Sequence, residues 1–119
     1  MRVLICDDEP AIRQLYRFAF ENAGAEVDEA ADGEECIAMA TDLNFDLIVL
    51  DLYMPKRDGL STLPELRECS PESQVFIVSA HAGVEVFSKG RALGATACFE
   101  KVGFLQRIPS VLARLTPAD

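Results

Sequence analysis

RVLICDDEP (residues 2–10) places an almost continuously apolar run directly before three acidic residues and a proline. Two similar runs follow, DLIVLD (46–51) and QVFIVS (74–79). Short segments that are rich in β-branched residues and apolar at consecutive positions indicate strands buried on both faces, which is typical of a parallel sheet covered by helices. These three runs therefore predict an α/β fold.

The remaining segments extend this pattern over the chain. TACFE (96–100) indicates a further strand, whereas EVDEA (26–30) alternates, with Val27 between acids, as expected for a strand at the sheet edge. Apolar residues with helical spacing or capping signals occupy the intervening segments, which are 10–23, 33–42, 59–69, 83–93 and 104–115. Gly24 is expected to end the first of these helices, and Asp32, with Glu35 three residues later, to cap the second. Strand and helix alternate five times, which predicts one doubly wound α/β domain with right-handed crossovers.

Two of these helices carry residues that disfavour helix. An interior glycine, Gly90, costs about 1 kcal/mol relative to alanine, and β-branched valines add to the cost, so we expect 83–93 to be the most mobile helix. Pro109 lies within 104–115, so that this helix either is kinked or starts late, with the proline in its first turn.

The composition narrows the class of protein. The 119 residues are 50% apolar and 26% charged, and no apolar run approaches the length of a bilayer span, which argues against a disordered or membrane protein and makes the cytoplasm the expected location. A net charge of −9 opposes direct binding of nucleic acid. The four cysteines have no metal-ligand spacing and are interpreted as small, reduced core residues: Cys6, Cys36, Cys69 and Cys98.

Polar residues follow four of the predicted strands. In an open parallel sheet ligands bind beyond the carboxyl ends of the strands, and these positions hold Asp7 and Asp8, Asp51, Ser79 and Lys101. Acids at strand ends are common, so each residue alone is weak evidence, but three carboxylates at one edge repel one another and favour a divalent cation. Carboxylates, a hydroxyl and an ammonium are the parts of a phosphoryl-transfer site in which an aspartate can be the acceptor.

The motifs at these positions resemble the receiver domain of two-component response regulators. They are DDEP (7–10), DLYMPKRDG (51–59), SA (79–80) and FEK (99–101), and the resemblance extends over essentially the whole chain, 1–119, as a single receiver domain with no output domain visible. It implies a flavodoxin-like, CheY-like fold with five parallel strands in the order 2-1-3-4-5 and five helices. The chain could be a complete regulator or the front of a longer one.

The resemblance also implies a metal-dependent phosphoacceptor. Asp51 would accept a phosphoryl group from a sensor histidine kinase, a phosphotransfer protein or a small acyl phosphate. Asp8, Asp51 and the backbone carbonyl of Tyr53 would bind Mg²⁺, with Mn²⁺ as a possible substitute, and Asp7 would hold a metal-bound water. Such a protein is a signalling switch with self-catalysed phosphotransfer and autodephosphorylation, not a classical enzyme.

The same resemblance implies how the signal would leave the site. Lys101 would pair with the phosphoryl group, the Ser79 hydroxyl would move to hydrogen-bond it, and Phe99 would turn inward. These changes would reshape the surface of the fourth helix, fifth strand and fifth helix for a downstream protein target or a covalently attached output domain. The valines and phenylalanine of 83–93 could form an apolar patch there, or could face the sheet.

One residue departs from the family pattern, and two others occupy positions that vary within the family. Val102 follows Lys101 where the family has a proline after a cis bond; a cis bond before valine would cost about 2.5–4 kcal/mol, so the loop is either strained or rebuilt. Tyr53 and His81 occupy variable positions that influence the lifetime of the phosphorylated state. We hypothesise that Tyr53 shields Asp51 and so makes the phosphorylated state long-lived. We interpret His81 as an exposed loop histidine and not as a catalytic base.

Other interpretations fit less well. A flavodoxin-like cofactor binder would need glycines and hydroxyls after the first strand, where this chain has acids. A dehalogenase-type phosphatase would need a DxD pair, but Leu52 and Tyr53 follow Asp51. The alternative from a different class is a receiver-like interaction module that signals without phosphorylation; the five site residues argue against it and Val102 keeps it open.

Overall fold

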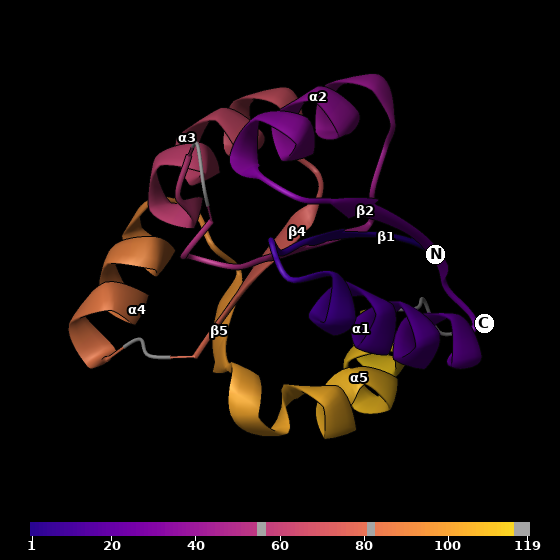
Figure 1. Cartoon of the computed structure of the whole chain (residues 1–119). Coiled ribbons are helices and arrows are strands. Elements are labelled where there is room, and N and C mark those ends of the chain that lie inside the picture. Colours follow the sequence, from indigo (N-terminus) through magenta and orange to yellow (C-terminus); the bar gives the residue numbers. More distant parts are fainter. Residues whose placement is uncertain (55–56, 81–82, 116–119) are drawn as a thin grey trace.

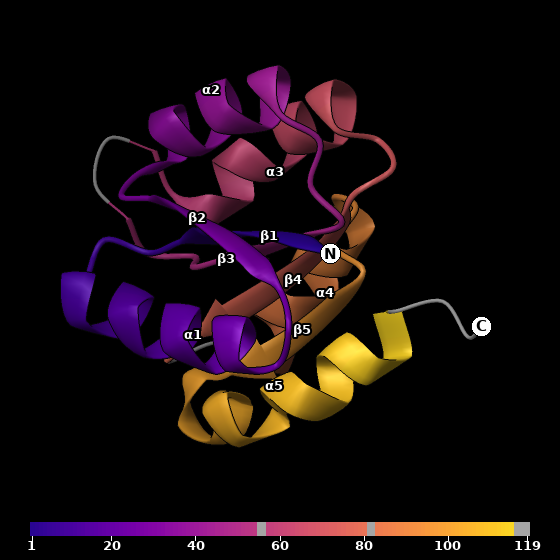
Figure 2. The same ribbon diagram turned by 90° about the vertical axis from the view of Figure 1, so that its right-hand side faces the viewer.

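The computed structural model describes residues 1–54, 57–80 and 83–115 and contains five strands alternating with five helices (Figures 1 and 2). In chain order they are β1 (Arg2–Cys6), α1 (Pro10–Asn22), β2 (Glu26–Ala30), α2 (Gly33–Asp42), β3 (Leu47–Leu50), α3 (Gly59–Cys69), β4 (Gln74–Ser79), α4 (Val84–Ala92), β5 (Ala97–Glu100) and α5 (Lys101–Leu115).

All neighbouring strands are parallel, in the order β2-β1-β3-β4-β5, which confirms the predicted doubly wound sheet. EVDEA is an edge strand, as predicted, and β5 forms the other edge. The register pairs Cys6 with Leu50 and Leu50 with Ile77, so the carboxyl ends of the three central strands lie side by side. This edge holds the polar residues singled out in the sequence.

The sheet separates two apolar layers. Alternate residues of β1 point to opposite faces: Val3 and Ile5 pack with α1 and α5, whereas Leu4 and Cys6 pack with α2 and α3. Figure 1 shows α1 and α5 below the sheet and α2, α3 and α4 on the other side. The apolar runs are therefore continuous because both sides of the central strands are buried, as predicted.

The signals at the ends of two helices are confirmed. Gly24 has φ +102, a conformation that glycine adopts readily, and it lies just beyond the end of α1. Asp32 caps α2, because its carboxylate accepts a 2.8 Å hydrogen bond from the backbone N–H of Glu35.

The two unusual helices have physical explanations. Gly90 is buried, and a Cβ there would overlap with the side chain of Ile77, so glycine lets α4 lie close to β4. Pro109 lies inside α5, which does not start late; the non-helical backbone lies instead at Val102 and Gly103, where Gly103 has φ +90. A kink is present, but near the start of the helix.

The sequence left open whether the apolar residues of α4 form an exposed patch or face the sheet, and the structure shows some in each position. Val84 is 83% exposed, whereas Val86 and Phe87 are partly buried and pack against the core.

The cysteines carry no disulfide; Cys6 and Cys36 are buried, and Cys69 and Cys98 are partly buried. Within the described ranges, no helix combines the length and apolarity that crossing a bilayer requires.

Candidate functional site at the carboxyl edge of the sheet

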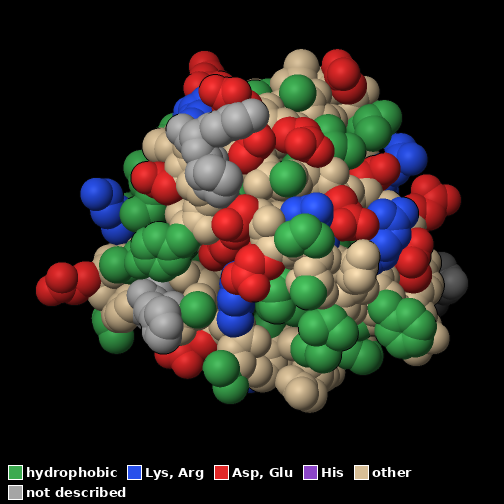
Figure 3. All heavy atoms as spheres, in the orientation of Figure 1, with side chains coloured by type: hydrophobic (Ala, Val, Ile, Leu, Met, Phe, Trp, Pro, Cys, Tyr) green, Lys and Arg blue, Asp and Glu red, His purple; other side chains and the backbone are tan. Residues whose placement is uncertain are grey.

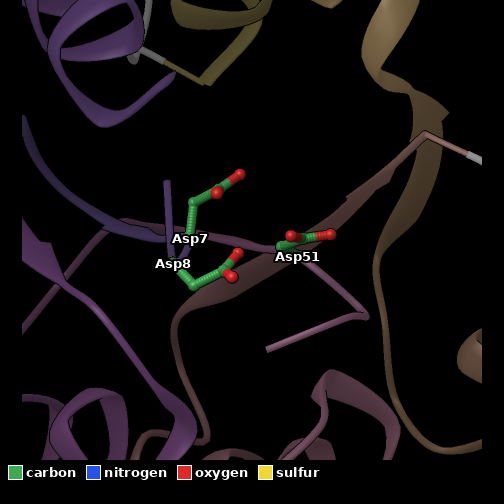
Figure 4. Close-up of side chains that lie close together, drawn as sticks. All are labelled: Asp7, Asp8 and Asp51. Carbon is green, nitrogen blue, oxygen red and sulfur yellow. The ribbon is translucent and has the colours of Figure 1, made fainter. Parts of the chain in front are cut away.

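The structure brings together the acidic residues that the sequence singled out. Asp7 and Asp8 follow β1 and Asp51 follows β3, and carboxylate oxygens from all three lie within 4.8 Å of one another (Figure 4). Asp7 and Asp51 are buried, whereas Asp8 is exposed at the mouth of the cluster. Three oxygen-donor side chains converging from two strands can hold a hard divalent cation.

Lys101, which follows β5, also lies at this cluster. Its ammonium lies 2.9 Å from a carboxylate oxygen of Asp7 and 3.3 Å from one of Asp51. It is the first residue of α5, directly after β5, so the strand order carries it across the edge to β1 and β3. Glu9 is more distant, at 3.9 Å from the ammonium, and stands at the N-cap of α1, so it is an outer member of the cluster.

Backbone contacts hold Asp7 in place. Its Oδ1 accepts a 2.9 Å hydrogen bond from the N–H of Glu9, and its carbonyl oxygen accepts a 2.7 Å bond from the guanidinium of Arg13. Arg13 is held in turn by Glu29 on β2, at 2.9 Å. Sequence reasoning missed Arg13 and Glu29, because only the pairing of β1 with β2 brings Glu29 beside α1.

Asp51 is positioned by the loop that follows it. Its Oδ1 accepts a hydrogen bond of 3.4 Å from the N–H of Tyr53, and its own N–H donates to the carbonyl of Cys6 at 2.9 Å. Gly59 packs against the same turn: a Cβ there would overlap with the carbonyl oxygen of Asp51 and lie 2.8 Å from the Cα of Leu52. The glycine of the DLYMPKRDG motif therefore permits α3 to begin directly behind Asp51.

The cluster carries more negative than positive charge. Burial, together with the charge of Asp7, raises the pKa of Asp51 to about 6, although Lys101 opposes the change. Burial by itself lowers the pKa of Lys101, but the hydrogen bond to Asp7 and the charges of Asp51 and Asp7 raise it overall. The lysine stays protonated, and it is one positive charge beside a cluster of three carboxylates, so an excess of negative charge remains when all three are ionised.

Ser79 and Phe99 occupy different surroundings. Ser79 is fully buried at the end of β4, and its hydroxyl has no hydrogen-bond partner among the described residues. Phe99 is partly buried on β5, with the rings of Phe76 and Phe104 each 5.3 Å away. An unpaired buried hydroxyl is costly, which marks Ser79 as a group available to a ligand at this edge.

Val102, which departs from the family pattern, and Tyr53, at a variable position, have different environments. The Lys101–Val102 bond is trans, as are all other peptide bonds of the described chain, and Val102 is 88% exposed. The loop is thus rebuilt, with Gly103 making the turn, and Lys101 still reaches both carboxylates. Tyr53 is 57% exposed beside Asp51, whereas His81 lies outside the described residues.

The chain is similar to known proteins over nearly its whole length. It is 36% identical over 119 residues to the DNA-binding dual master transcriptional regulator RpaA of Synechocystis, covering 95% of this chain and 49% of RpaA. It spans about half the length of several curated relatives.

Solved structures agree in fold. The receiver domain of the Francisella response regulator 1452 superposes with a TM-score of 0.87 at 31% identity, covering 96% of this chain and 94% of that one. The Vibrio cholerae chemotaxis protein CheY4 gives a TM-score of 0.87 at 30% identity, covering 97% and 98%. The family model for the response regulator receiver domain matches residues 3–113. The chain therefore belongs to the receiver domains of two-component response regulators.

Proposed function

We propose that Asp51 is the phosphoacceptor of this receiver domain. The observation that carries the proposal is the cluster of Asp7, Asp8 and Asp51 together with the ammonium of Lys101, which lies within 3.3 Å of Asp7 and Asp51. This arrangement retains excess negative charge by itself, and it suits a site that binds a cation together with a phosphoryl group.

The donor set fits a hard divalent ion. Asp8, Asp51 and the backbone carbonyl of Tyr53 would hold Mg²⁺ directly, and Asp7 would hold one of its waters; Mn²⁺ prefers similar oxygen ligands. When bound, the ion would neutralise charge on the carboxylates and on the incoming phosphoryl oxygens. The exposure of Asp8 and the burial of Asp51 leave the open side of the site toward solvent, where a donor can approach.

Transfer of the phosphoryl group forms one bond to phosphorus and breaks another. An Asp51 carboxylate oxygen attacks phosphorus, a P–O bond forms, and the P–N bond of a phosphohistidine or the P–O bond of an acyl phosphate breaks, with the electron pair leaving on the donor. Lys101 is placed to contact the transferred group, because its ammonium already touches Asp51. The donor would be a sensor histidine kinase or a phosphotransfer protein.

The signal would then pass to the side of the domain formed by α4, β5 and α5. The unpaired Ser79 hydroxyl can hydrogen-bond a phosphoryl oxygen. Phe99 is not placed to follow Ser79 as the resemblance implied, because its ring packs with Phe76 and Phe104 on the α1 and α5 side of the sheet. Ser79, two residues after Ile77, points to the side of α2, α3 and α4. A downstream protein or a covalently attached output domain would read the changed surface. Residues 1–119 would act as one receiver unit, in the cytoplasm, where such kinases present their phosphohistidine.

A phosphorylation test with acetyl phosphate addresses the proposal directly. Intact-mass measurement of the wild type should show one phosphate adduct that requires Mg²⁺. Asp51→Asn should lose it, because the amide is a far weaker nucleophile than the carboxylate, whereas Asp42→Asn, which removes an exposed aspartate at the end of α2, should keep it. An adduct that survives Asp51→Asn, or none on the wild type with any donor, would contradict the proposal.

Tyr53 is proposed to prolong the phosphorylated state. Tyr53 is 57% exposed and its backbone N–H contacts the carboxylate of Asp51, so its side chain would cover part of the path by which water reaches the phosphoryl group. Tyr53→Ala should therefore speed loss of the adduct in a timed mass measurement, with Tyr53→Phe close to wild type. An unchanged rate in Tyr53→Ala would refute the shielding role. We also propose that His81, at the other variable position, influences the lifetime of the phosphorylated state.

A receiver-like module that signals without phosphorylation is not favoured. Such a module has no need of a lysine held between two buried carboxylates, or of a buried hydroxyl without a partner. Val102, which kept this alternative open in the sequence, does not displace Lys101 from the carboxylates.

A further inference from the structure

The carbonyl oxygen of Asp7 lies just beyond the paired part of β1. The pairing of β1 with β2 and with β3 ends at Cys6, and the N–H of Asp7 still donates to the carbonyl of Ala30 on β2 at 3.1 Å. The carbonyl of Asp7 instead accepts its hydrogen bond from a side chain, the guanidinium of Arg13 on α1, at 2.7 Å. A backbone oxygen of a buried residue needs a partner, so Arg13 replaces the sheet pairing at this point.

The same carbonyl belongs to the peptide group that joins Asp7 to Asp8. Because a peptide group is planar, the contact with Arg13 restrains the direction in which the chain continues to Asp8. Within the described residues the Asp8 side chain has no hydrogen bond or ion pair of its own, and yet its carboxylate lies with those of Asp7 and Asp51 (Figure 4). The position of the Asp8 carboxylate therefore depends on how its backbone is held.

Arg13 is itself held in one orientation by the edge strand. Its Nε donates to a carboxylate oxygen of Glu29 at 2.9 Å while its Nη1 reaches Asp7, so two nitrogens of one planar group join β2 to the loop after β1. The Arg13 and Glu29 side chains are only 16% and 23% exposed. The other carboxylate oxygen of Glu29 accepts from Arg17 at 2.6 Å, and Arg17 also donates to the carbonyl of Val27 at 3.1 Å. The two arginines therefore share Glu29, but the contact to Asp7 comes from Arg13.

We infer that Arg13 is a positioning residue for the metal ligands, which ties the edge strand β2 to Asp7 and Asp8 through the Asp7 carbonyl. The inference rests on the proposed function, in which these acids and Asp51 hold a divalent ion. Outer contacts that orient metal ligands typically change metal affinity by about ten- to a hundredfold, and we expect the lower end because Arg13 acts through a peptide group. The charge of Arg13 has the opposite effect, since a cation near the acidic cluster repels a metal ion. Loss of position and loss of charge thus change the affinity in opposite directions when the arginine is removed.

The test is the affinity for Mn²⁺ alone, measured on the full chain from the electron paramagnetic resonance signal of the free ion. Arg13→Met, which lacks the charge and the donors, should bind Mn²⁺ about tenfold more weakly than the wild type. Arg13→Lys should also bind more weakly, because one ammonium does not replace two nitrogens of a planar guanidinium. Arg17→Met is the matched control: it removes the same charge from the same helix and the same carboxylate, and it should bind at least as tightly as the wild type.

Urea unfolding separates positioning from a loss of stability. Glu29 keeps Arg17 as a partner in Arg13→Met, so this variant should be folded under the binding conditions, and Arg13→Lys tests the inference if it is not.

Three results would overturn the inference while the proposed function stands. They are wild-type or tighter binding by folded Arg13→Met, wild-type binding by Arg13→Lys, and an equal loss of affinity in Arg17→Met. If the wild type did not bind Mn²⁺, or if Asp51→Asn bound it as tightly as the wild type, the inference and the proposed metal site would both be wrong.

Discussion

At the scale of the residue, Asp51 shows how burial prepares a carboxylate for a ligand. The side chain is 4% exposed and shares the ammonium of Lys101 with Asp7, so its negative charge is only partly compensated. Burial and the charge of Asp7 raise the pKa of Asp51 to about 6 from an ordinary value of 3.8. The ionised carboxylate therefore destabilises the metal-free fold, and it is available to a cation.

Asp51→Asn should stabilise the metal-free protein at neutral pH. Since the pKa of Asp51 is higher in the folded than in the unfolded chain, wild-type stability falls as the pH rises from about 4 to about 6, and the penalty stays constant above that. Urea unfolding in EDTA should find the variant more stable by about 1–3 kcal/mol at pH 7, with the difference disappearing near pH 4.

Asp42→Asn serves as the control for this experiment, because it removes one negative charge from an exposed position remote from the cluster. Its stability should follow that of the wild type at every pH. A less stable Asp51→Asn at pH 7, or a difference from the wild type that does not depend on pH, would show that the Asp51 charge is not the cause.

At the scale of the element, the start of α3 supports the site from behind. The side chain of Asp58 caps the helix by accepting a 2.8 Å hydrogen bond from the N–H of Ser61, and the N–H of Gly59 donates to the carbonyl of Leu52 at 2.8 Å. The absence of a side chain at Gly59 lets this first turn touch the backbone of Asp51. The helix thus determines where the Asp51 carboxylate stands.

Gly59→Ala should destabilise the fold by about 1–3 kcal/mol, although alanine favours helix, because the added methyl group meets backbone atoms that have no room to move. Phosphorylation by acetyl phosphate should also slow, since the turn that carries Asp51 must shift.

The control for this change is Gly83→Ala, at the N-cap of α4. A Cβ there has no neighbour within 4 Å and the φ of −78 suits alanine, so any loss should be smaller and phosphorylation should be unaffected. Urea unfolding and timed intact-mass measurement report the two effects. Wild-type stability and rate in Gly59→Ala would show that the close approach is not needed.

At the scale of the whole molecule, charge governs what the domain can bind. The chain carries twenty acidic and eleven basic residues, and Figure 3 shows acidic side chains gathered across the face that is shown. A net charge of −9 repels the phosphates of nucleic acid, so the domain itself is suited to proteins and cations. Any contact with DNA would belong to a partner or to an attached domain.

The isolated chain should therefore leave duplex DNA unbound. Fluorescence anisotropy of a labelled duplex should stay constant up to about 100 µM protein in low salt, because no counterions are released by an acidic surface. A basic peptide provides the positive control. A rise in anisotropy that salt removes would contradict this expectation and point to a local basic patch.

Much of this architecture could be predicted from neighbouring residues in the chain. Continuous apolarity in RVLIC indicated a strand buried on both faces, and Asp32 and Gly24 indicated helix ends, because burial pattern and capping are local properties. The candidate site residues could be named for the same reason, since the fold class implies that strand ends share one edge. Pro109 indicated a kinked helix or a late start, whereas the non-helical backbone lies at Val102 and Gly103 and Pro109 lies inside the helix.

The sequence by itself determined the α/β fold and the residues at its carboxyl edge, whereas the tertiary structure decided how they meet. Lys101 reaches Asp51 across fifty positions of the chain, and Arg107 stacks on Phe99 across two elements. Such contacts depend on strand order, register and the angle at which α5 packs. These are set by the whole core at once, so no local pattern encodes them.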